Sequence, residues 1–171
     1  TGDLFACAGA NVTPDIVTLS KALTGGTLPL SAAVASRHVH EAFWSDDPGA
    51  ALMHGPTYMA NPLACAAANA SLDLFEDDDW RHQVGWIEAG LRDGLAPCRA
   101  ARGVVDVRVR GAIGVVEFVE PVDVGGLSRR FAELGVWIRP MGRVVYLTPA
   151  YVIDSSELEQ LTEAVRQGLG I

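Results

Sequence analysis

The sequence predicts an α/β fold over residues 1–101, followed by a small α+β domain over residues 102–171. In the first part, short runs of β-branched and apolar residues alternate with longer helical patterns, which is typical of an α/β layout. After Gly103 the pattern changes to period-two alternation in VVDVRVRGAIGVVEFV, and a short helix, a further β region and a final helix follow. This change of periodicity sets the boundary between residues 101 and 102.

The composition indicates a globular protein that acts on small molecules or on other proteins. Its 171 residues are 49% hydrophobic, which is enough to bury a core. A formal charge of -8 works against nucleic acid or an anionic membrane as the main partner. No apolar run approaches the roughly 18 residues that span a bilayer, and the opening TGDLFACAGANVTPD lacks the layout of a signal peptide. We therefore expect a cytoplasmic protein.

The first predicted strand covers Ile16–Leu19, where apolar and β-branched residues follow one another without interruption. Such a run is typical of a strand buried in a parallel sheet, and it would end at Ser20 and Lys21. The TGG that begins at Thr24 predicts a turn. After it, LSAAVAS predicts a second strand, and a helix is expected over residues 37–44.

Asn61 and Pro62 mark the start of a longer helix, because Asn caps the first turn and Pro fits there without losing a hydrogen bond. This helix should run to about Asp77, with one buried apolar stripe formed by Leu63, Ala67, Ala70 and Leu74. A second helix is expected over residues 80–96, where Pro97 helps to end it.

The α+β part should open with a pair of strands. In the first of them, one face carries Val105, Val107 and Val109 and the other carries Asp106, Arg108 and Arg110. A short helix over residues 127–134 and a β region over residues 135–153 follow. Asp154 should cap the final helix, with Glu157 completing a capping box. The buried face of that helix should hold Leu158, Leu161, Val165 and Leu169.

Lys21 is the strongest candidate for a catalytic residue. Twelve of the 13 basic residues are arginine, so Lys21 is the only lysine of the chain. A surface charge could have been arginine, whereas carbonyl chemistry needs a primary amine that can lose its proton, which arginine cannot do in a protein. The alternative is an ordinary solvated lysine in a loop, and the residue alone does not decide between the two.

Two further segments are candidate binding sites. In HGPTYMANP, the turn Gly55-Pro56-Thr57 offers backbone N–H groups and a hydroxyl to a phosphate group, although a turn that merely precedes a helix would look the same. In GVWIRP, Arg139 stands alone among apolar residues and is suited to hold a carboxylate, or else forms an ion pair at the rim. Tyr146 either lines the same pocket or has only a structural role in packing.

No metal site is predicted. Cys7, Cys65 and Cys98 are widely separated and form no CxxC pair, so we interpret them as buried thiols. His38 and His40 stand two apart, which on a helix points them in different directions.

Together these segments resemble the class-III, fold-type I aminotransferases that use pyridoxal 5′-phosphate, and the resemblance covers essentially all 171 residues. PDIVTLSKALTGGTLPLSA is similar to the family's lysine segment, which implies that Lys21 forms the Schiff base and moves the proton. HGPTYMANPLACAAA is similar to the segment that contacts the cofactor phosphate of the neighbouring subunit. It implies cofactor binding by Gly55, Pro56 and Thr57, and a homodimer in which Thr57 reaches the other subunit's cofactor.

Within the family, the chain most resembles the enzymes of biotin biosynthesis that aminate 8-amino-7-oxononanoate with S-adenosylmethionine as amino donor. The similarity lies in Pro56 with Met59 and in GVWIRPMGRVVYLTPAYVI, where Met141 replaces the usual Phe. It implies that Arg139 holds the substrate carboxylate and that Tyr146 and Gly55 line the pocket. Another ω-aminotransferase, acting on ornithine, a diamine or 4-aminobutyrate, remains an alternative, as does a non-catalytic assembly module.

The resemblance also implies a fragment. In the family, the aspartate that pairs with the cofactor ring lies shortly before the position matching Thr1. The Gly-Ser phosphate loop, the aromatic residue that stacks on the ring and much of the donor pocket lie further upstream. We therefore expect the chain to be the C-terminal part of a fold-type I transferase: the end of the large-domain mixed sheet with its helices, plus the small domain. On this view it is inactive alone.

Overall fold

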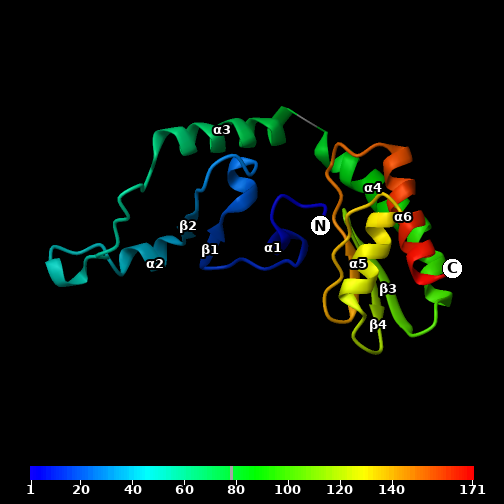
Figure 1. Ribbon diagram of the computed structural model, residues 1–171. Coiled ribbons are helices and arrows are strands. Elements are labelled where there is room, and N and C mark those ends of the chain that lie inside the picture. Colours follow the sequence, from blue (N-terminus) through cyan, green and yellow to red (C-terminus); the bar gives the residue numbers. More distant parts are fainter. Residues whose placement is uncertain (78) are drawn as a thin grey trace. The chain divides into compact units, whose positions relative to one another are not determined.

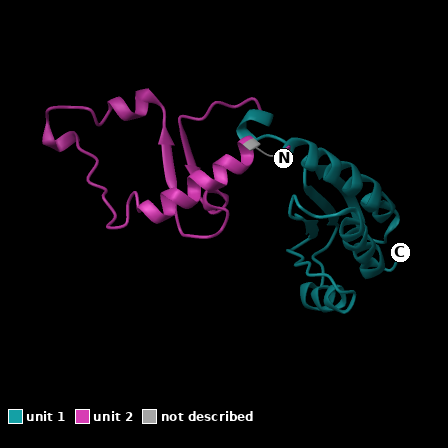
Figure 2. Ribbon diagram, turned by 90° about the horizontal axis from the view of Figure 1, so that it is seen from above, with its two compact units in different colours: residues 1–9, 80–171 teal, residues 10–79 magenta. Residues whose placement is uncertain are grey.

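The computed structural model describes residues 1–77 and 79–171, and contacts divide the chain into two compact units (Figures 1 and 2). Unit 1 contains residues 1–9 and 80–171, and unit 2 contains residues 10–79. Unit 1 therefore includes the helix that begins at Trp80, although this helix precedes the domain boundary expected at residues 101–102. That boundary stays a prediction. None of the helices in the described ranges is both long and apolar enough to cross a membrane.

In unit 2, strand β1 (Ile16–Leu19) has the predicted bounds and pairs with β2 (Ala32–Ala35). The pair is antiparallel, with Ile16 opposite Ala35 and Leu19 opposite Ala32, and β1 alternates between exposed and half-buried residues. The prediction of a buried parallel strand is therefore wrong for this chain. The link between the strands holds only the short 3-10 turn η1 (Lys21–Thr24), and a parallel pair would need a longer crossover, usually a helix.

The rest of unit 2 consists of the short helix α2 (Arg37–Glu41), the turn η2 (Pro48–Ala50) and the long helix α3 (Pro62–Asp77). The predicted start of α3 is confirmed, because the Asn61 side chain accepts hydrogen bonds from the N–H groups of Leu63 (3.0 Å) and Ala64 (3.5 Å). The helix packs against η1.

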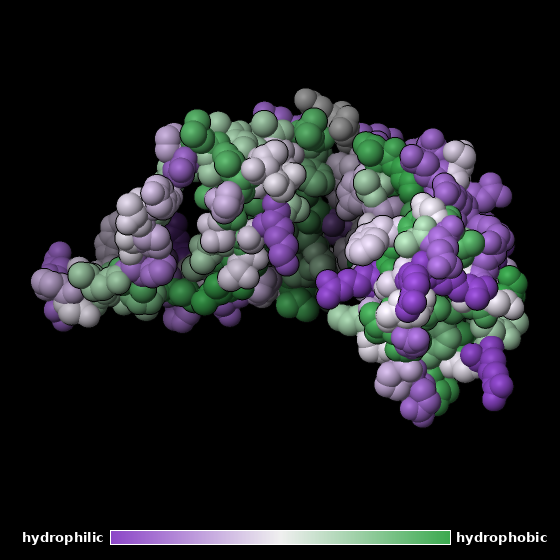
Figure 3. All heavy atoms as spheres, in the orientation of Figure 1, coloured by the Kyte–Doolittle hydropathy of each residue, from purple (hydrophilic) through white to green (hydrophobic). Residues whose placement is uncertain are grey.

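The predicted buried stripe of α3 is wrong. Ala64 and Ala68 are buried instead, whereas Leu63 and Leu74 are 72% and 61% exposed. Alanines on the face toward η1 allow a close approach, whereas the two leucines stay exposed to solvent. Figure 3 shows hydrophobic residues at the surface of unit 2, and Leu52 and Met53 are further exposed apolar side chains of this unit.

Unit 1 is a three-stranded antiparallel sheet with helices packed on it. Its strands are β3 (Val104–Arg110), β4 (Ile113–Phe118) and β5 (Val144–Leu147), in the order β3-β4-β5. Helix α4 (Trp80–Leu95) packs on β3, β4 and α6 (Ser155–Leu169), and α5 (Val124–Glu133) packs on α6. Short elements complete the unit, namely α1 (Ala6–Gly9) and the 3-10 turn η3 (Ala96–Ala100). The core contains Val84, Ile87, Leu91, Val116, Phe131, Val145 and Val165.

The strand pair of the α+β part is confirmed, but its alternation breaks at one point. The register shifts between Val104 and Asp106, so that Val105 is an extra residue without a partner on β4. Val105 is accordingly 57% exposed, whereas Val107 is buried as predicted. The bulge thus removes one valine from the face that the sequence pattern assigned to the core.

The C-terminal elements follow their capping signals. Asp154 and Glu157 form the predicted capping box at the start of α6, and Leu158 and Val165 are buried. Helix α5 begins three residues earlier than predicted, because Asp123 accepts a hydrogen bond from the Gly126 N–H (3.0 Å) and caps it. The β region expected over residues 135–153 contains only β5 and a bridge from Met141 to Val144.

Candidate active site

Lys21 lies where the chain leaves β1 and turns into η1. The preceding Ser20 is extended, but Lys21 itself has a φ of 51°. A residue with a side chain pays about 1–2 kcal/mol to adopt this left-handed conformation, and such strain persists only where the surroundings enforce it, often at functional sites. The lysine is solvent-exposed, so its amine is accessible to a ligand.

Two neighbouring hollows connect Lys21 with the second predicted segment. The first, of about 310 Å³, is lined by Lys21, Ser20 and Gly26 together with Thr27, Leu28, Pro29 and Leu30. The second, of about 720 Å³, shares Ser20, Pro29 and Leu30 with the first and is also lined by His54, Pro56 and Tyr58. Unit 2 therefore brings the lysine turn and the HGPTY segment to adjoining hollows, as an active site would require.

Of the predicted cofactor residues in this segment, Pro56 lines the larger hollow, whereas Gly55 and Thr57 lie beside it in the sequence and are exposed. The Met59 N–H donates to the Pro56 carbonyl (2.9 Å), which closes a turn around Thr57 and Tyr58. Thr57 thus presents its hydroxyl from a turn, although it contributes to neither hollow.

The predicted carboxylate site lies in unit 1. Arg139 is exposed and stands between Ile138 and Pro140, both buried, in an extended segment outside the sheet. A two-residue hairpin follows, closed by hydrogen bonds of 2.9 Å in both directions between Met141 and Val144, with Gly142 at a φ of 57°. Arg139 is therefore held by its buried neighbours and by the hairpin that leads into β5.

Tyr146 lies on β5 opposite Val115 and is half-buried. Its neighbours Val145 and Leu147 are buried in the core, so Tyr146 stands on the other face of the sheet. Lys21, Gly55, Pro56 and Thr57 thus belong to unit 2, and Arg139 and Tyr146 belong to unit 1.

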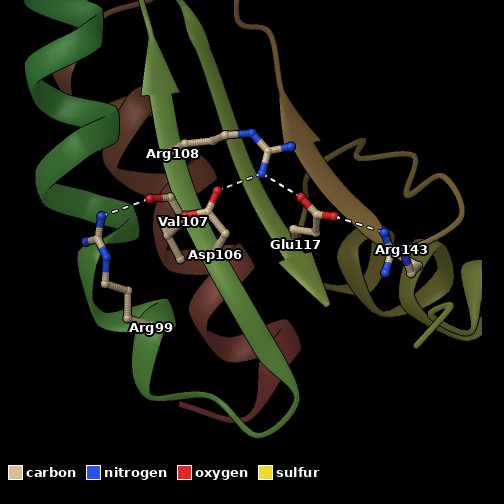
Figure 4. Close-up of polar contacts among 6 residues, drawn as sticks. All are labelled: Arg99, Asp106, Val107, Arg108, Glu117 and Arg143. Carbon is tan, nitrogen blue, oxygen red and sulfur yellow. Dashed lines mark hydrogen bonds and ion pairs between the residues drawn. The ribbon is translucent and has the colours of Figure 1, made fainter. Parts of the chain in front are cut away.

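The sheet face that carries Tyr146 also holds a group of ion pairs that the sequence did not indicate as a unit (Figure 4). Arg108, whose partner Val115 is also the partner of Tyr146, pairs with Asp106 (2.8 Å) and Glu117 (2.6 Å). Glu117 also pairs with Arg143 (3.3 Å) in the hairpin. The hydrogen bond to Asp106, followed in importance by the one to Glu117, raises the pKa of the Arg108 guanidinium. The strand register brings Asp106, Arg108 and Glu117 together, and the hairpin before β5 adds Arg143.

Thr24 is the functional candidate that the sequence reading missed. It is one of two polar residues buried in the described parts of the chain. The sequence signal that could have indicated a role for Thr24 is its position in the same turn as the only lysine. No three His, Cys, Asp or Glu side chains gather as metal ligands within residues 1–77 and 79–171.

The chain belongs to the class-III aminotransferase family, whose pattern matches residues 1–169. The lysine turn, the adjoining HGPTY segment and the small α+β unit are thus parts of an aminotransferase fold.

Among its relatives, the chain is similar to the adenosylmethionine-8-amino-7-oxononanoate aminotransferases of Corynebacterium glutamicum, with 45% identity over 96% of this chain, and of Mycobacterium leprae, with 43% identity over all of it. The chain spans 39% of the length of each of these proteins. A crystal structure of the enzyme of that name from Methanocaldococcus jannaschii matches 99% of this chain and 42% of its own, with 30% identity and a TM-score of 0.88. An amine transaminase from an uncultivated Pseudomonas species, described as PLP-bound, matches with a TM-score of 0.89 at 27% identity.

Proposed function

We propose that this chain supplies the catalytic lysine and the carboxylate site of an aminotransferase that converts 8-amino-7-oxononanoate to 7,8-diaminononanoate in biotin biosynthesis. The observation that carries the proposal is the only lysine of the chain, strained and exposed at the rim of a hollow that adjoins the HGPTY segment. The names of the relatives support the choice of substrate and S-adenosylmethionine as amino donor.

The residues present fit pyridoxal 5′-phosphate. Lys21 offers an accessible primary amine at the end of a strand, and Thr57 offers a hydroxyl from a turn. When bound, this cofactor supplies the electron sink for carbanion chemistry. Lys21 would hold it covalently through Nζ, while Gly55, Pro56 and Thr57 would contact the phosphate, with Thr57 serving the neighbouring subunit of a homodimer.

Lys21 has a second task in each half of the reaction. While its Nζ is not bonded to the cofactor, Lys21 would act as the base that moves the proton from or to the substrate carbon. An exposed amine on a fixed backbone suits this exchange, because the amine must leave and return without losing its position. Arginine at this position would keep the charge and lose both functions.

Arg139 would bind the substrate carboxylate through two parallel hydrogen bonds. Tyr146 and Gly55 are the other residues that we propose to contact the substrate. The hairpin from Met141 to Val144 limits the freedom of the arginine backbone, so less ordering is needed when the substrate binds.

The test uses a polypeptide of the relatives' full length that contains this segment. Lys21→Ala and the charge-matched Lys21→Arg should both lose turnover and the visible absorbance of the lysine-bound cofactor. Arg139→Lys should instead raise the KM for 8-amino-7-oxononanoate with a smaller change in kcat. A Lys21→Ala enzyme with normal turnover would disprove the proposal.

A different substrate within the family is the second candidate, because structures titled acetylornithine and ornithine aminotransferase also match, with TM-scores of 0.82 and 0.84. Half-reactions with 8-amino-7-oxononanoate and with 2-oxoglutarate separate the two. Fast amination of 2-oxoglutarate alone would exclude the biotin-pathway reaction.

A non-catalytic assembly module is the alternative from another class. It predicts that the full-length polypeptide binds its partners equally well with Lys21→Ala and that neither half-reaction proceeds in the unaltered protein.

A further inference from the structure

We propose that Thr24 is a positioning residue, which holds the backbone of Lys21 in its left-handed conformation and thereby sets how fast the lysine amine returns to the reacting carbon. This inference rests on the proposed function and extends it to a residue that contacts neither cofactor nor substrate.

Thr24 is buried, with 3% of its surface exposed, although it lies in a short turn among exposed residues. Its hydroxyl donates a hydrogen bond of 2.6 Å to the carbonyl of Leu28. Its own carbonyl accepts hydrogen bonds from the Thr27 hydroxyl (2.8 Å) and the Thr27 N–H (3.2 Å). A buried hydroxyl is retained where its hydrogen bond fixes a conformation, because burial without a partner is costly.

These bonds close the loop that begins at Lys21. The Lys21 carbonyl accepts a hydrogen bond from the Gly26 N–H (3.3 Å), and the Ala22 carbonyl accepts one from the Gly25 N–H (3.0 Å). Gly25 and Gly26 have φ values of 59° and 79°, which glycine adopts without strain. Three residues with positive φ in one short turn leave the backbone few other ways to connect β1 with Leu28.

Helix α3 anchors the same turn from outside. The Ser71 hydroxyl donates to the Ala22 carbonyl (3.2 Å), and α3 packs along η1. Because α3 begins directly after the HGPTY segment, one rigid helix links that segment to the lysine turn. Leu28, the acceptor of the Thr24 hydroxyl, also lines the hollow beside Lys21.

The geometry points to a kinetic role. Over one complete transamination, Nζ of Lys21 would be released once and would return once, and a strained backbone keeps its conformation only while the surrounding bonds enforce it. Without the Thr24 hydroxyl the turn can relax, which moves the amine away from the position where it transfers the proton. Misplacement of a reacting group by about 1 Å can cost on the order of a hundredfold in rate.

The experiment compares Thr24→Val, which keeps the shape but removes the donor, with Thr24→Ser, which keeps the donor. Thr18→Val is the matched control, because Thr18 is exposed on β1. In the full-length holoenzyme, Thr24→Val should lower kcat by about tenfold to a hundredfold and shift the absorbance of the lysine-bound cofactor, with KM and cofactor content unchanged. Thr24→Ser should restore most of kcat.

An unchanged kcat in Thr24→Val, or a loss that Thr24→Ser does not rescue, overturns the inference. If Thr24→Val does not fold, Ser71→Ala tests the same turn from α3, and it should lower kcat in the same direction; an unchanged kcat there also overturns the inference. The proposed function fails separately, if Lys21→Ala retains turnover. Loss of turnover in the Lys21 variants together with an unchanged kcat in Thr24→Val therefore refutes the positioning role alone.

Discussion

Three glycines of helix α4 provide a test of how closely α4 packs on α6. A side chain added at Gly85 would meet nothing within 4 Å. At Gly90 it would lie 2.5 Å from Cδ2 of Leu158, and at Gly94 it would lie 2.5–2.7 Å from Oγ1, Cβ and Cγ2 of Thr162. The same substitution in the same helix thus meets open space, a movable side-chain end and a fixed group.

The expected changes in the free energy of unfolding follow from these contacts. Replacing glycine by alanine within a helix contributes about 1 kcal/mol through propensity, so Gly85→Ala should stabilise by up to about that amount. Overpacking costs about 1–3 kcal/mol. The end of Leu158 can rotate away, which leaves Gly90→Ala near neutral. The Cβ of Thr162 cannot move without the backbone of α6, so Gly94→Ala should destabilise by up to about 2 kcal/mol, the overpacking cost less the gain in propensity.

Urea unfolding of the chain at a fixed temperature, followed by tryptophan fluorescence, measures the three variants against the unaltered protein. The slope of the unfolding free energy with urea should not change, because the surface exposed on unfolding stays the same. A Gly94→Ala variant at least as stable as Gly85→Ala would refute the reasoning, since it would show that α4 and α6 are not in close contact.

Two further predictions concern titratable groups. The pKa of Asp154 is lowered, chiefly because the Glu157 N–H donates to its carboxylate (2.8 Å). The folded pKa therefore lies below the unfolded one, so the ionised cap stabilises the folded protein at pH values above the unfolded pKa. This stabilisation is lost as the pH falls through the folded pKa. Asp154→Asn keeps a cap that does not titrate, so thermal melts should show less acid destabilisation below about pH 4, and equal acid sensitivity would contradict this. Burial raises the pKa of the Cys98 thiol, so a thiol reagent should modify Cys98 only as the protein unfolds and Cys7 and Cys65, which are half-buried, sooner; equal rates for all three thiols would argue against it.

Local signals in the sequence predicted the elements that depend on neighbouring residues. The run from Ile16 to Leu19, the Asn61 cap with Pro62 and the capping box at Asp154 each define a strand or a helix end through contacts within a few residues. For that reason, β1, α3 and α6 have bounds at or close to those predicted. The strand pair after Gly103 was equally readable, because alternation is a local property of a strand.

Several features were decided by contacts between distant segments. The face of α3 that becomes buried depends on where η1 packs, so Ala64 and Ala68 take the place that the apolar pattern gave to Leu63 and Leu74. The antiparallel partner of β1 and the bulge at Val105 depend on how two strands meet. The hydrophobic periodicity of a single segment predicts neither the partner strand nor the bulge.

The candidate site divides in the same way. By itself, the sequence determined which functional groups the candidate site can use, because a lone lysine, a GPT turn and an isolated arginine are choices of functional group. Only the tertiary structure decided the geometry: the left-handed backbone of Lys21, the adjoining hollows lined by Lys21 and by the HGPTY segment, and the burial of Thr24. Functional groups belong to single residues, whereas strain, burial and proximity arise only when segments far apart in the chain are packed together.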